Sequence, residues 1–230
     1  MVDTTQRPAF GAGGRRRSLV ALAGALMAVF IVNSLIGLFA MQMDREAAVA
    51  DDERLHRLVN ALDVAREAQV AFKIQVQEWK NTLLRGGAPA DFNRYVAGFE
   101  AQERRVAAHL ESLSGMAAPL GLDTNAIDEV RTAHRTLGLR YREALARYDA
   151  ANPASAFAVD TQVRGIDRPL DHTIDTLAES TRKRLQALQA EIDTAAAERT
   201  ATLRTVTIAG MLVGLALIGV ILLRAGGRRD

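Results

Sequence analysis

Arginine is concentrated between residues 125 and 151, where guanidinium groups recur on one stretch of chain. The set comprises Arg131, Arg135, Arg140, Arg142 and Arg147. A guanidinium fork binds a carboxylate through two parallel hydrogen bonds, so such a set can hold a small anion. We select Arg131, Arg135 and Arg142 as candidate ligand-binding residues. The alternative is a solvated helix face, on which the arginines pair with neighbouring acidic residues: Asp128, Glu129, Glu143 and Asp149.

Gln69 is a further candidate, because it interrupts an otherwise apolar helix face. A buried amide can set helix register, contact a ligand, or meet solvent or another polar core group. Three histidines, His109, His134 and His172, are expected at similar heights along their helices, which makes them candidates for a metal site. The helical phase of His172 directs it outward, so converging metal ligands are not expected.

Signatures of catalysis and of thiol chemistry are missing from the sequence. It has no glycine-rich phosphate loop, no zinc-binding His-Glu motif, no Gly-x-Ser-x-Gly elbow and no cysteine. The formal net charge of +2 hides a slightly acidic centre. Much of the basic excess lies near the two ends, at Arg7, Arg15, Arg16, Arg17, Arg224, Arg228 and Arg229. We therefore expect no enzyme, no cofactor, no metal and no nucleic-acid partner.

The stretch from residue 44 to residue 85 predicts the long helix around which the other elements pack. Its apolar seam is Leu55, Leu58, Leu62, Ala65, Gln69, Phe72, Val76, Trp79 and Leu83. Steps of three and four residues alternate along it, which is the spacing that keeps one stripe against partner helices. Gly86, Gly87 and Pro89 predict its end. Phe72, Trp79 and Gly86 are expected to be structural anchors, with ligand stacking as the alternative for Trp79.

Three more helices are predicted after this one, and no stretch alternates as a strand would. Asp91 is the expected cap of a helix over residues 91–113, and residues 115–121, which contain Pro119, are the expected loop. Asn125 is the expected cap of a helix over residues 125–151. Asn152 and Pro153 predict the start of a fourth helix that runs unbroken into the second apolar stretch.

Gly165 and Pro169 are structural anchors within this fourth helix. Proline crowds the carbonyl of the residue four positions before it, which here is a glycine, so we expect a tolerated kink. The kink could be a signalling hinge or a simple adjustment of shape.

Two uncharged stretches, residues 18–43 and 205–223, are long enough to cross a membrane. Arginines precede the first and follow the second, so both tails, residues 1–17 and 224–230, are expected to be cytoplasmic and residues 44–204 to face the other side. A cleaved signal peptide is the alternative for the first stretch, with a site at residues 48–50. Gly210 and Gly214 have the spacing of close membrane-helix packing.

These elements predict an all-α protein: an antiparallel four-helix bundle on a two-helix stalk, with two transmembrane helices. The two middle helices are about 35 and 40 Å long, whereas the first and fourth are about 63 and 78 Å, so the short pair accompanies only part of the long pair. A two-helix stalk cannot bury its apolar stripe alone. We therefore expect a homodimer.

Two segments resemble the periplasmic sensor region of bacterial methyl-accepting chemotaxis receptors of the four-helix-bundle type. They are residues 71–86 (AFKIQVQEWKNTLLRG) and residues 163–170 (VRGIDRPL). The resemblance implies an inner-membrane protein with a periplasmic sensor domain, which in this family often holds small anionic metabolites. None of the family's ligand motifs matches, so no ligand residue is carried over. The chain ends seven residues after the second apolar stretch, and the cytoplasmic signalling helices of such receptors are not expected in it.

The sequence therefore predicts a two-pass, chemoreceptor-type sensor domain that binds a small molecule or a partner receptor and has no output module of its own. Full-length chemoreceptors are its expected partners. The alternatives are a membrane-tethered structural or protein-interaction module without a ligand, and a truncated receptor fragment.

Overall fold

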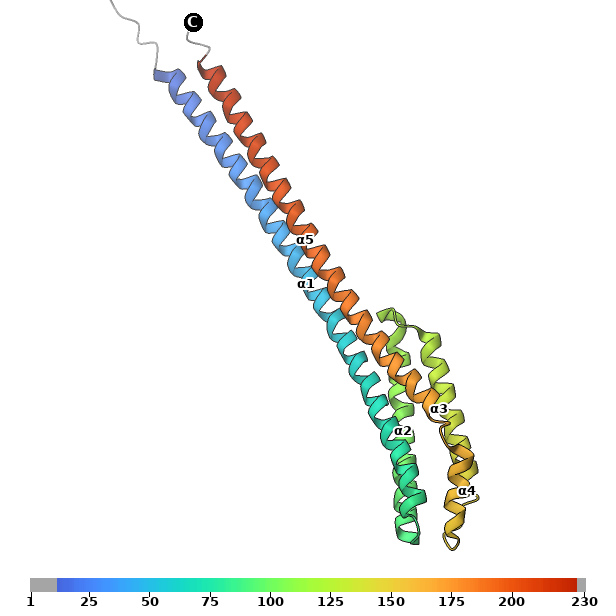
Figure 1. Ribbon diagram of the computed structural model, residues 1–230. Helices are drawn as coiled ribbons and strands as arrows, with labels where there is room; N and C mark the ends of the chain where they lie inside the picture. Colours follow the sequence, from blue (N-terminus) through green and yellow to red (C-terminus); the bar gives the residue numbers. More distant parts are fainter. Residues whose placement is uncertain (1–11, 227–230) are drawn as a thin grey trace, which may run out of the picture. The chain divides into compact units, whose positions relative to one another are not determined.

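The computed structural model describes residues 12–226, and every regular element in this range is an α-helix. The helices are α1 (Ala12–Arg85), α2 (Pro89–Leu120), α3 (Thr124–Leu145), α4 (Pro153–Val163) and α5 (Arg168–Gly226) (Figure 1). The predicted all-α class is confirmed for this range. Most of the predicted N-terminal tail and residues 227–230 lie outside the described residues, but residues 12–17 already belong to α1. Extending a formed helix by a few residues needs no new nucleus, so α1 begins before the apolar stretch.

The chain divides into two compact units, which are described separately. The five-helix unit comprises residues 51–191 and contains parts of α1 and α5 together with all of α2, α3 and α4. The two-helix unit comprises the described residues up to 50 and from 192 onward.

The core of the five-helix unit is built on the predicted seam of α1. Leu58, Leu62, Phe72, Trp79 and Leu83 are all buried. Four alanines of α1 are also buried on this side, at positions 61, 65, 68 and 71, and their small side chains let neighbouring helices approach closely. All five helices contribute to the core; the residues from α2 to α5 include Phe99, Val106, Leu110, Ile127, Val130, Tyr141, Val159, Leu170 and Ile174. Within the unit, α2 packs against α3, and α3 against α4.

Helix α1 ends at Arg85, as the glycines predicted. The Gly86 amide donates to the Thr82 carbonyl at 3.1 Å, and a side chain at Gly86 would collide with that carbonyl. The predicted start of the next helix was two residues late, because α2 begins at Pro89 without a side-chain cap. Proline is well suited to a first helical position, since its missing N–H would be unpaired there anyway. Asp91 instead pairs with Arg94 at 3.1 Å.

The predicted loop over residues 115–121 was wrong. Helix α2 continues through Gly115 and Pro119 to Leu120 and ends at Gly121, whose φ of 68° is readily adopted by glycine. The Gly121 amide donates to the Ala118 carbonyl at 3.2 Å. Buried Ala117 and the partly buried neighbours that pack on the core keep this last segment helical.

The predicted cap and end of the third helix were also wrong. Asp123, not Asn125, caps α3: its carboxylate accepts hydrogen bonds from the backbone amides of Asn125 and Ala126, at 3.0 and 3.1 Å. A cap two residues earlier satisfies the first free amides of the helix. Helix α3 ends at Leu145 rather than at residue 151, because the amides of Arg147 and Tyr148 donate to the carbonyls of Ala144 and Leu145, three residues back, in a tighter turn.

The predicted unbroken fourth helix is in fact two helices. Asn152 caps α4 as expected, by accepting from the Ala154 amide at 3.0 Å. Helix α4 stops at Val163, Gly165 adopts a φ of 77°, and α5 begins at Arg168. Pro169 therefore lies in the first turn of α5 and not in a kinked helix interior. A left-handed glycine and a first-turn proline together end one helix and start another.

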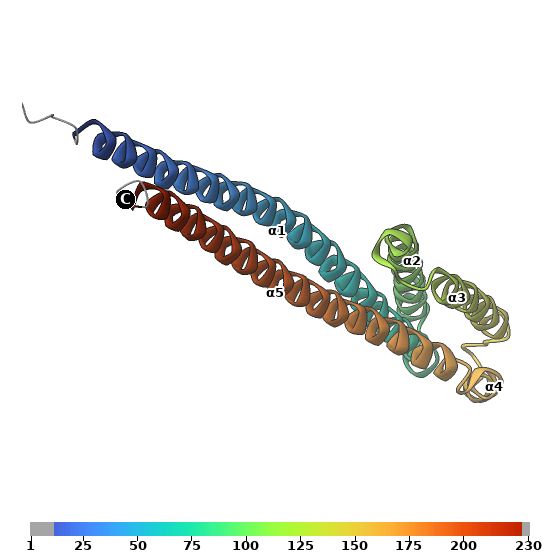
Figure 2. The ribbon, with the colours of Figure 1, turned by 90° about the horizontal axis from the view of Figure 1, so that it is seen from above.

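In the two-helix unit, the segments of α1 and α5 run side by side in both views (Figures 1 and 2). Each of the two helices is long and apolar enough to cross a membrane. Their large apolar side chains face outward: Phe30, for example, is 73% exposed and Leu215 is 64% exposed. A continuous apolar surface of this kind suits a hydrocarbon environment. Gly210 lies against the Asn33 amide and Gly214 against the Val29 side chain, so the two predicted glycines sit where the helices meet.

Candidate ligand-binding site

A pocket of about 320 Å³ opens between α2 and α3 in the five-helix unit. All three candidate arginines, Arg131, Arg135 and Arg142, line it, and α2 adds Arg104. Glu103 and Glu111 of α2 provide the carboxylates of the wall. Leu110 and His134, both buried, form its inner part.

Helical periodicity explains why these side chains converge. Arg131 and Arg135 are one turn apart on α3, and Arg142 follows two turns later on the same stripe. On α2, Glu103 and Glu111 are separated by about two turns and so share a face. Because α2 packs against α3, the two stripes meet across the pocket.

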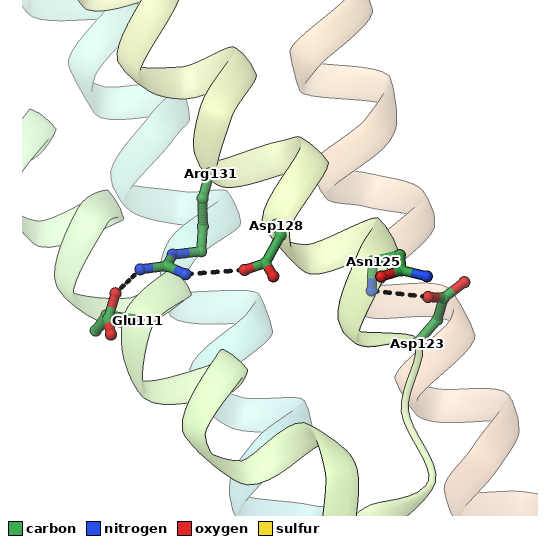
Figure 3. A network of polar contacts seen from close by, with 5 residues as sticks. All are labelled: Glu111, Asp123, Asn125, Asp128 and Arg131. Carbon is green, nitrogen blue, oxygen red and sulfur yellow. Dashed lines mark hydrogen bonds and ion pairs between the residues drawn. The ribbon is translucent and has the colours of Figure 1, made fainter.

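Two of the three candidate arginines are held by carboxylates of the protein itself. The Arg131 guanidinium donates to Glu111 of α2 and, at 2.8 Å, to Asp128 of α3 (Figure 3). The Arg142 guanidinium donates to Glu103 at 2.5 Å. Gly138 provides the room for this second contact, because a side chain there would collide with the Glu103 carboxylate. The pocket thus already shows the charge-assisted contacts that an incoming anion would make.

Arg135 differs from these two residues. It lines the pocket, and within the described residues no carboxylate lies at hydrogen-bond or ion-pair distance from its guanidinium. Four guanidinium groups and two carboxylates line the pocket, and Glu100 and Asp128 beside it pair with Arg104 and Arg131. Among the described residues, the guanidinium that keeps an uncompensated positive charge is therefore that of Arg135. This arrangement is suited to a small anionic solute.

His134 closes the inner side of the pocket and is almost fully buried, at 3% exposure. Its Nε2 lies 2.9 Å from the Gln75 amide oxygen of α1, and the Phe72 ring packs edge-on against the imidazole. Burial, and secondarily the positive charge of Arg142, lowers the pKa of His134 from 6.5 to about 4. The imidazole is therefore neutral at pH 7, and its Nε2 can donate a hydrogen bond to Gln75.

Gln69, the fourth candidate residue, lies elsewhere. Its amide donates to Asp175 of α5, and Lys73 Nζ lies 3.4 Å from the same carboxylate. Gln69 is not part of the arginine pocket. Arg140 and Arg147 are also separate, because they line a groove between α3 and α4.

The predicted structural anchors are placed as follows. Trp79 is 3% exposed and its ring centroid lies 4.5 Å from that of Tyr141 and 6.0 Å from that of Phe99. Phe72 is buried beside His134, Gly86 is at the end of α1, and Gly165 and Pro169 are at the break before α5. Trp79 is thus surrounded by aromatic rings of the core.

Reasoning from the sequence missed four members of the site: Glu103, Glu111, Arg104 and Gln75. Glu103 carried a usable signal, because it stands at a position of the α2 stripe where apolar residues precede and follow it. A charged residue at such a position needs a partner on the facing helix. Gln75 lies next to the seam of α1 and gave no comparable signal.

The comparisons with known proteins point to chemotaxis receptors. The chain is 32% identical over 213 residues to the methyl-accepting chemotaxis protein CtpH of Pseudomonas aeruginosa. This similarity covers 90% of the present chain and 37% of that relative. It supports the resemblance to chemoreceptors that the sequence suggested. No protein-family model matches the chain, and no solved structure matches it significantly.

Proposed function

We propose that the chain is a chemoreceptor-type sensor protein whose five-helix unit binds a small anionic solute in the pocket between α2 and α3. The observation that carries this proposal is the convergence of Arg104, Arg131, Arg135 and Arg142 on one pocket. The similarity to a methyl-accepting chemotaxis protein supports a role in signal transduction. The five-helix unit then corresponds to a four-helix sensor bundle in which α4 and α5 together take the fourth position.

The proposed location is the bacterial inner membrane, with two spans, both termini in the cytoplasm and the five-helix unit in the periplasm. The arginines that flank the apolar stretches support this orientation. A homodimer is also proposed. Val70 and Ile74 of α1 are 56% and 39% exposed, and an apolar pair one turn apart suits contact with a second copy. Full-length chemoreceptors are proposed as partners in signal output, which the similarity to a methyl-accepting chemotaxis protein supports.

A second function is favoured by the pairing within the pocket. Since Arg131 and Arg142 already have carboxylate partners, the site can also be read as a stable contact between α2 and α3. The five-helix unit would then be a membrane-tethered interaction module without a ligand.

The test is calorimetric titration and thermal unfolding of the full chain in detergent micelles. The probes are succinate, aspartate, citrate, sulfate and inorganic phosphate, with a neutral sugar as the reference. An anion at one hundred times its dissociation constant should add about 2.7 kcal/mol to the free energy of unfolding. The matched variants are Arg135→Gln inside the pocket and Arg140→Gln outside it, which change charge equally.

We expect Arg135→Gln to abolish or strongly weaken the anion effect and Arg140→Gln to preserve it. If no anion stabilises the protein, or if the two variants lose binding equally, the pocket is not the site. An unresponsive but well-folded protein would favour the interaction module.

A further inference from the structure

His134 has one ring nitrogen that the protein engages and one that it leaves open. Its Nε2 lies 2.9 Å from the Gln75 amide oxygen of α1, so this nitrogen faces the core. Nδ1 makes no hydrogen bond within the described residues. It is also not among their fully enclosed atoms without a partner, which are Asn33 Oδ1, Gln75 Nε2 and Gln102 Oε1. Since His134 lines the pocket between α2 and α3, Nδ1 is the ring nitrogen that a bound molecule can reach.

The contact with Gln75 decides what Nδ1 can do. A neutral imidazole carries its proton on one nitrogen and accepts a hydrogen bond through the other. The amide oxygen is an acceptor, so Nε2 holds the proton and Nδ1 keeps a lone pair. Burial, ahead of the positive charge of Arg142, lowers the pKa of His134 to about 4, so the two nitrogens are not both protonated at pH 7. The inner wall of the pocket therefore offers an acceptor, whereas its guanidinium groups only donate.

An acceptor at this place selects among anions. A carboxylate has no proton to donate, so its oxygens gain nothing from Nδ1. A ligand with a hydroxyl group beside its carboxylate can satisfy both groups of the pocket: the carboxylate pairs with Arg135 and the O–H donates to Nδ1. An ammonium group is also a donor, but the charge of Arg142 that already lowers the pKa of His134 would oppose a second cation there.

We propose that the ligand of this pocket is a hydroxy monocarboxylate, with its carboxylate on Arg135 and its hydroxyl group donating to His134 Nδ1, and that Gln75 is the positioning residue that keeps Nδ1 an acceptor. This inference rests on the proposed anion site and adds the chemical class of its ligand. One carboxylate is sufficient, because among the described guanidinium groups of the pocket that of Arg135 lacks a carboxylate partner. Gln75 is completely buried, so water does not compete with it for Nε2.

The first measurement needs no ligand. Nitrogen-15 NMR of the full chain in detergent micelles, labelled at its four histidines, shows which ring nitrogen carries the proton. The His134 signals are identified by their loss in His134→Phe. We expect a protonated Nε2 and an unprotonated Nδ1 at pH 7, and a mixture of both tautomers in Gln75→Leu, which removes the acceptor. A protonated Nδ1 in the wild type, as a reversed Gln75 amide would impose, overturns the proposal.

The second measurement is calorimetric titration with pairs of acids that have equal charge. The pairs are lactate with propionate and 3-hydroxybutyrate with butyrate, each hydroxy acid as both enantiomers. In at least one pair the hydroxy acid should bind about three- to tenfold more tightly, which is the usual contribution of one hydrogen bond. Alanine, with an ammonium group in place of the hydroxyl, should bind no better than propionate.

The variants assign this preference to the imidazole. It should disappear in His134→Phe, shrink in Gln75→Leu and persist in Thr132→Ala, an exposed substitution on α3 outside this pocket. Circular dichroism establishes that each variant is folded, and Gln75→Leu keeps the test available if His134→Phe is not. Equal affinities within both pairs, or a preference that survives loss of the imidazole, would overturn the hydroxyl contact.

Arg135→Gln separates failure of this inference from failure of the anion site. If another anion binds in a manner that depends on Arg135 but the monocarboxylates do not, the ligand class is wrong and the anion site stands. If no anion binds, or if binding persists in Arg135→Gln, the proposed site itself is wrong.

Discussion

His134 Nε2 lies 2.9 Å from the Gln75 amide oxygen, and both side chains are buried where α3 meets α1. A neutral imidazole fits this position because Nε2–H can donate to the amide oxygen. Protonation of the imidazole would place a positive charge in a site that is almost inaccessible to water, which is unfavourable. The pair therefore joins the inner end of the arginine pocket to the core, and it makes the stability of the unit depend on pH.

Acidification should destabilise the protein between pH 6.5 and pH 4. Burial lowers the pKa of folded His134 to about 4 from 6.5, so the unfolded chain binds more protons in this window. The stabilisation is fully present above pH 6.5, and about 3 kcal/mol is lost by pH 4. Urea unfolding at pH 7, 5.5 and 4.5 should show a shallower pH dependence in His134→Gln. Thr132→Ala, an exposed substitution on the same helix that removes no ionisable group, is the control and should keep the wild-type slope.

Glu103→Gln should increase the affinity of the pocket for anions. The Glu103 carboxylate holds the Arg142 guanidinium at 2.5 Å, and its neutralisation frees that guanidinium for a ligand. Hydrogen bonds to charged groups contribute about 1.5–3 kcal/mol, so a roughly tenfold or larger gain is expected. Titration calorimetry with the anion found for the wild type measures it. Glu143→Gln, outside the pocket, is the matched control, and an equal gain in that variant would show a general charge effect only.

Trp79→Ala should strongly destabilise the five-helix unit. Trp79 is 3% exposed and packs on the Tyr141 and Phe99 rings, and removal of a buried aromatic ring costs about 3–5 kcal/mol. Unfolding is best followed by circular dichroism, because Trp79 is the only tryptophan of the chain. Leu84→Ala, at an 82% exposed position of the same helix, should change stability by less than about 0.5 kcal/mol. Comparable losses in the two variants would mean that Trp79 is not a core residue.

Gly165→Ala should lower the free energy of unfolding by about 1–2 kcal/mol, since only the left-handed backbone conformation opposes the new side chain. The space for a Cβ is adequate, because the nearest atom of Arg168 would lie 3.6 Å away. Gly87 is the control: a Cβ there meets nothing within 4 Å and its φ is not positive. Thermal unfolding should separate the two alanine variants. Equal melting temperatures would contradict the left-handed conformation at Gly165.

Gly214→Ala should disturb the contact between α1 and α5 in the two-helix unit. A Cβ at Gly214 would lie 2.7 Å from Val29 Cγ1, and a branched side chain at that depth of the contact has few other rotamers. Val29→Ala should rescue the variant by removing the obstructing methyl groups. Gly219→Ala is the control, because a Cβ there has open space. The wild type, Gly214→Ala, Val29→Ala and the double variant form a double-mutant cycle. Its interaction energy, obtained from thermal stability in detergent, should be stabilising.

The sequence predicted the helices better than their ends. The seam of α1 was found because a regular apolar spacing is a property of many residues together. Single capping residues were less informative: Asp91 and Asn125 could cap a helix, but Pro89 and Asp123 start the helices earlier. Pro119 was read as a helix stop, yet buried Ala117 and its neighbours hold the last turns of α2 together. Local preferences of a few residues were outweighed by tertiary packing.

The arginine stripe illustrates the same limit for the site. Arg131, Arg135 and Arg142 could be selected because helical spacing places them together. The facing carboxylates could not, since the register of α2 against α3 depends on how the helices pack. Gln69 was selected because it interrupts the apolar seam of α1. In the structure its side chain contacts Asp175 of α5, which also pairs with Lys73. Gly165 and Pro169 were expected to produce a kink within one helix, but together they end α4 and start α5.

The four buried alanines of α1 have a mechanical consequence. A helix surface built from bulky, interlocking side chains is deeply corrugated, and displacement along its axis forces those side chains over one another. Positions 61, 65, 68 and 71 instead present single methyl groups, so this surface of α1 is comparatively smooth. The energy barrier to axial displacement along this part of α1 is correspondingly low, whereas Ala68→Leu, at a position that is 1% exposed, would overpack the core and force the neighbouring helices apart.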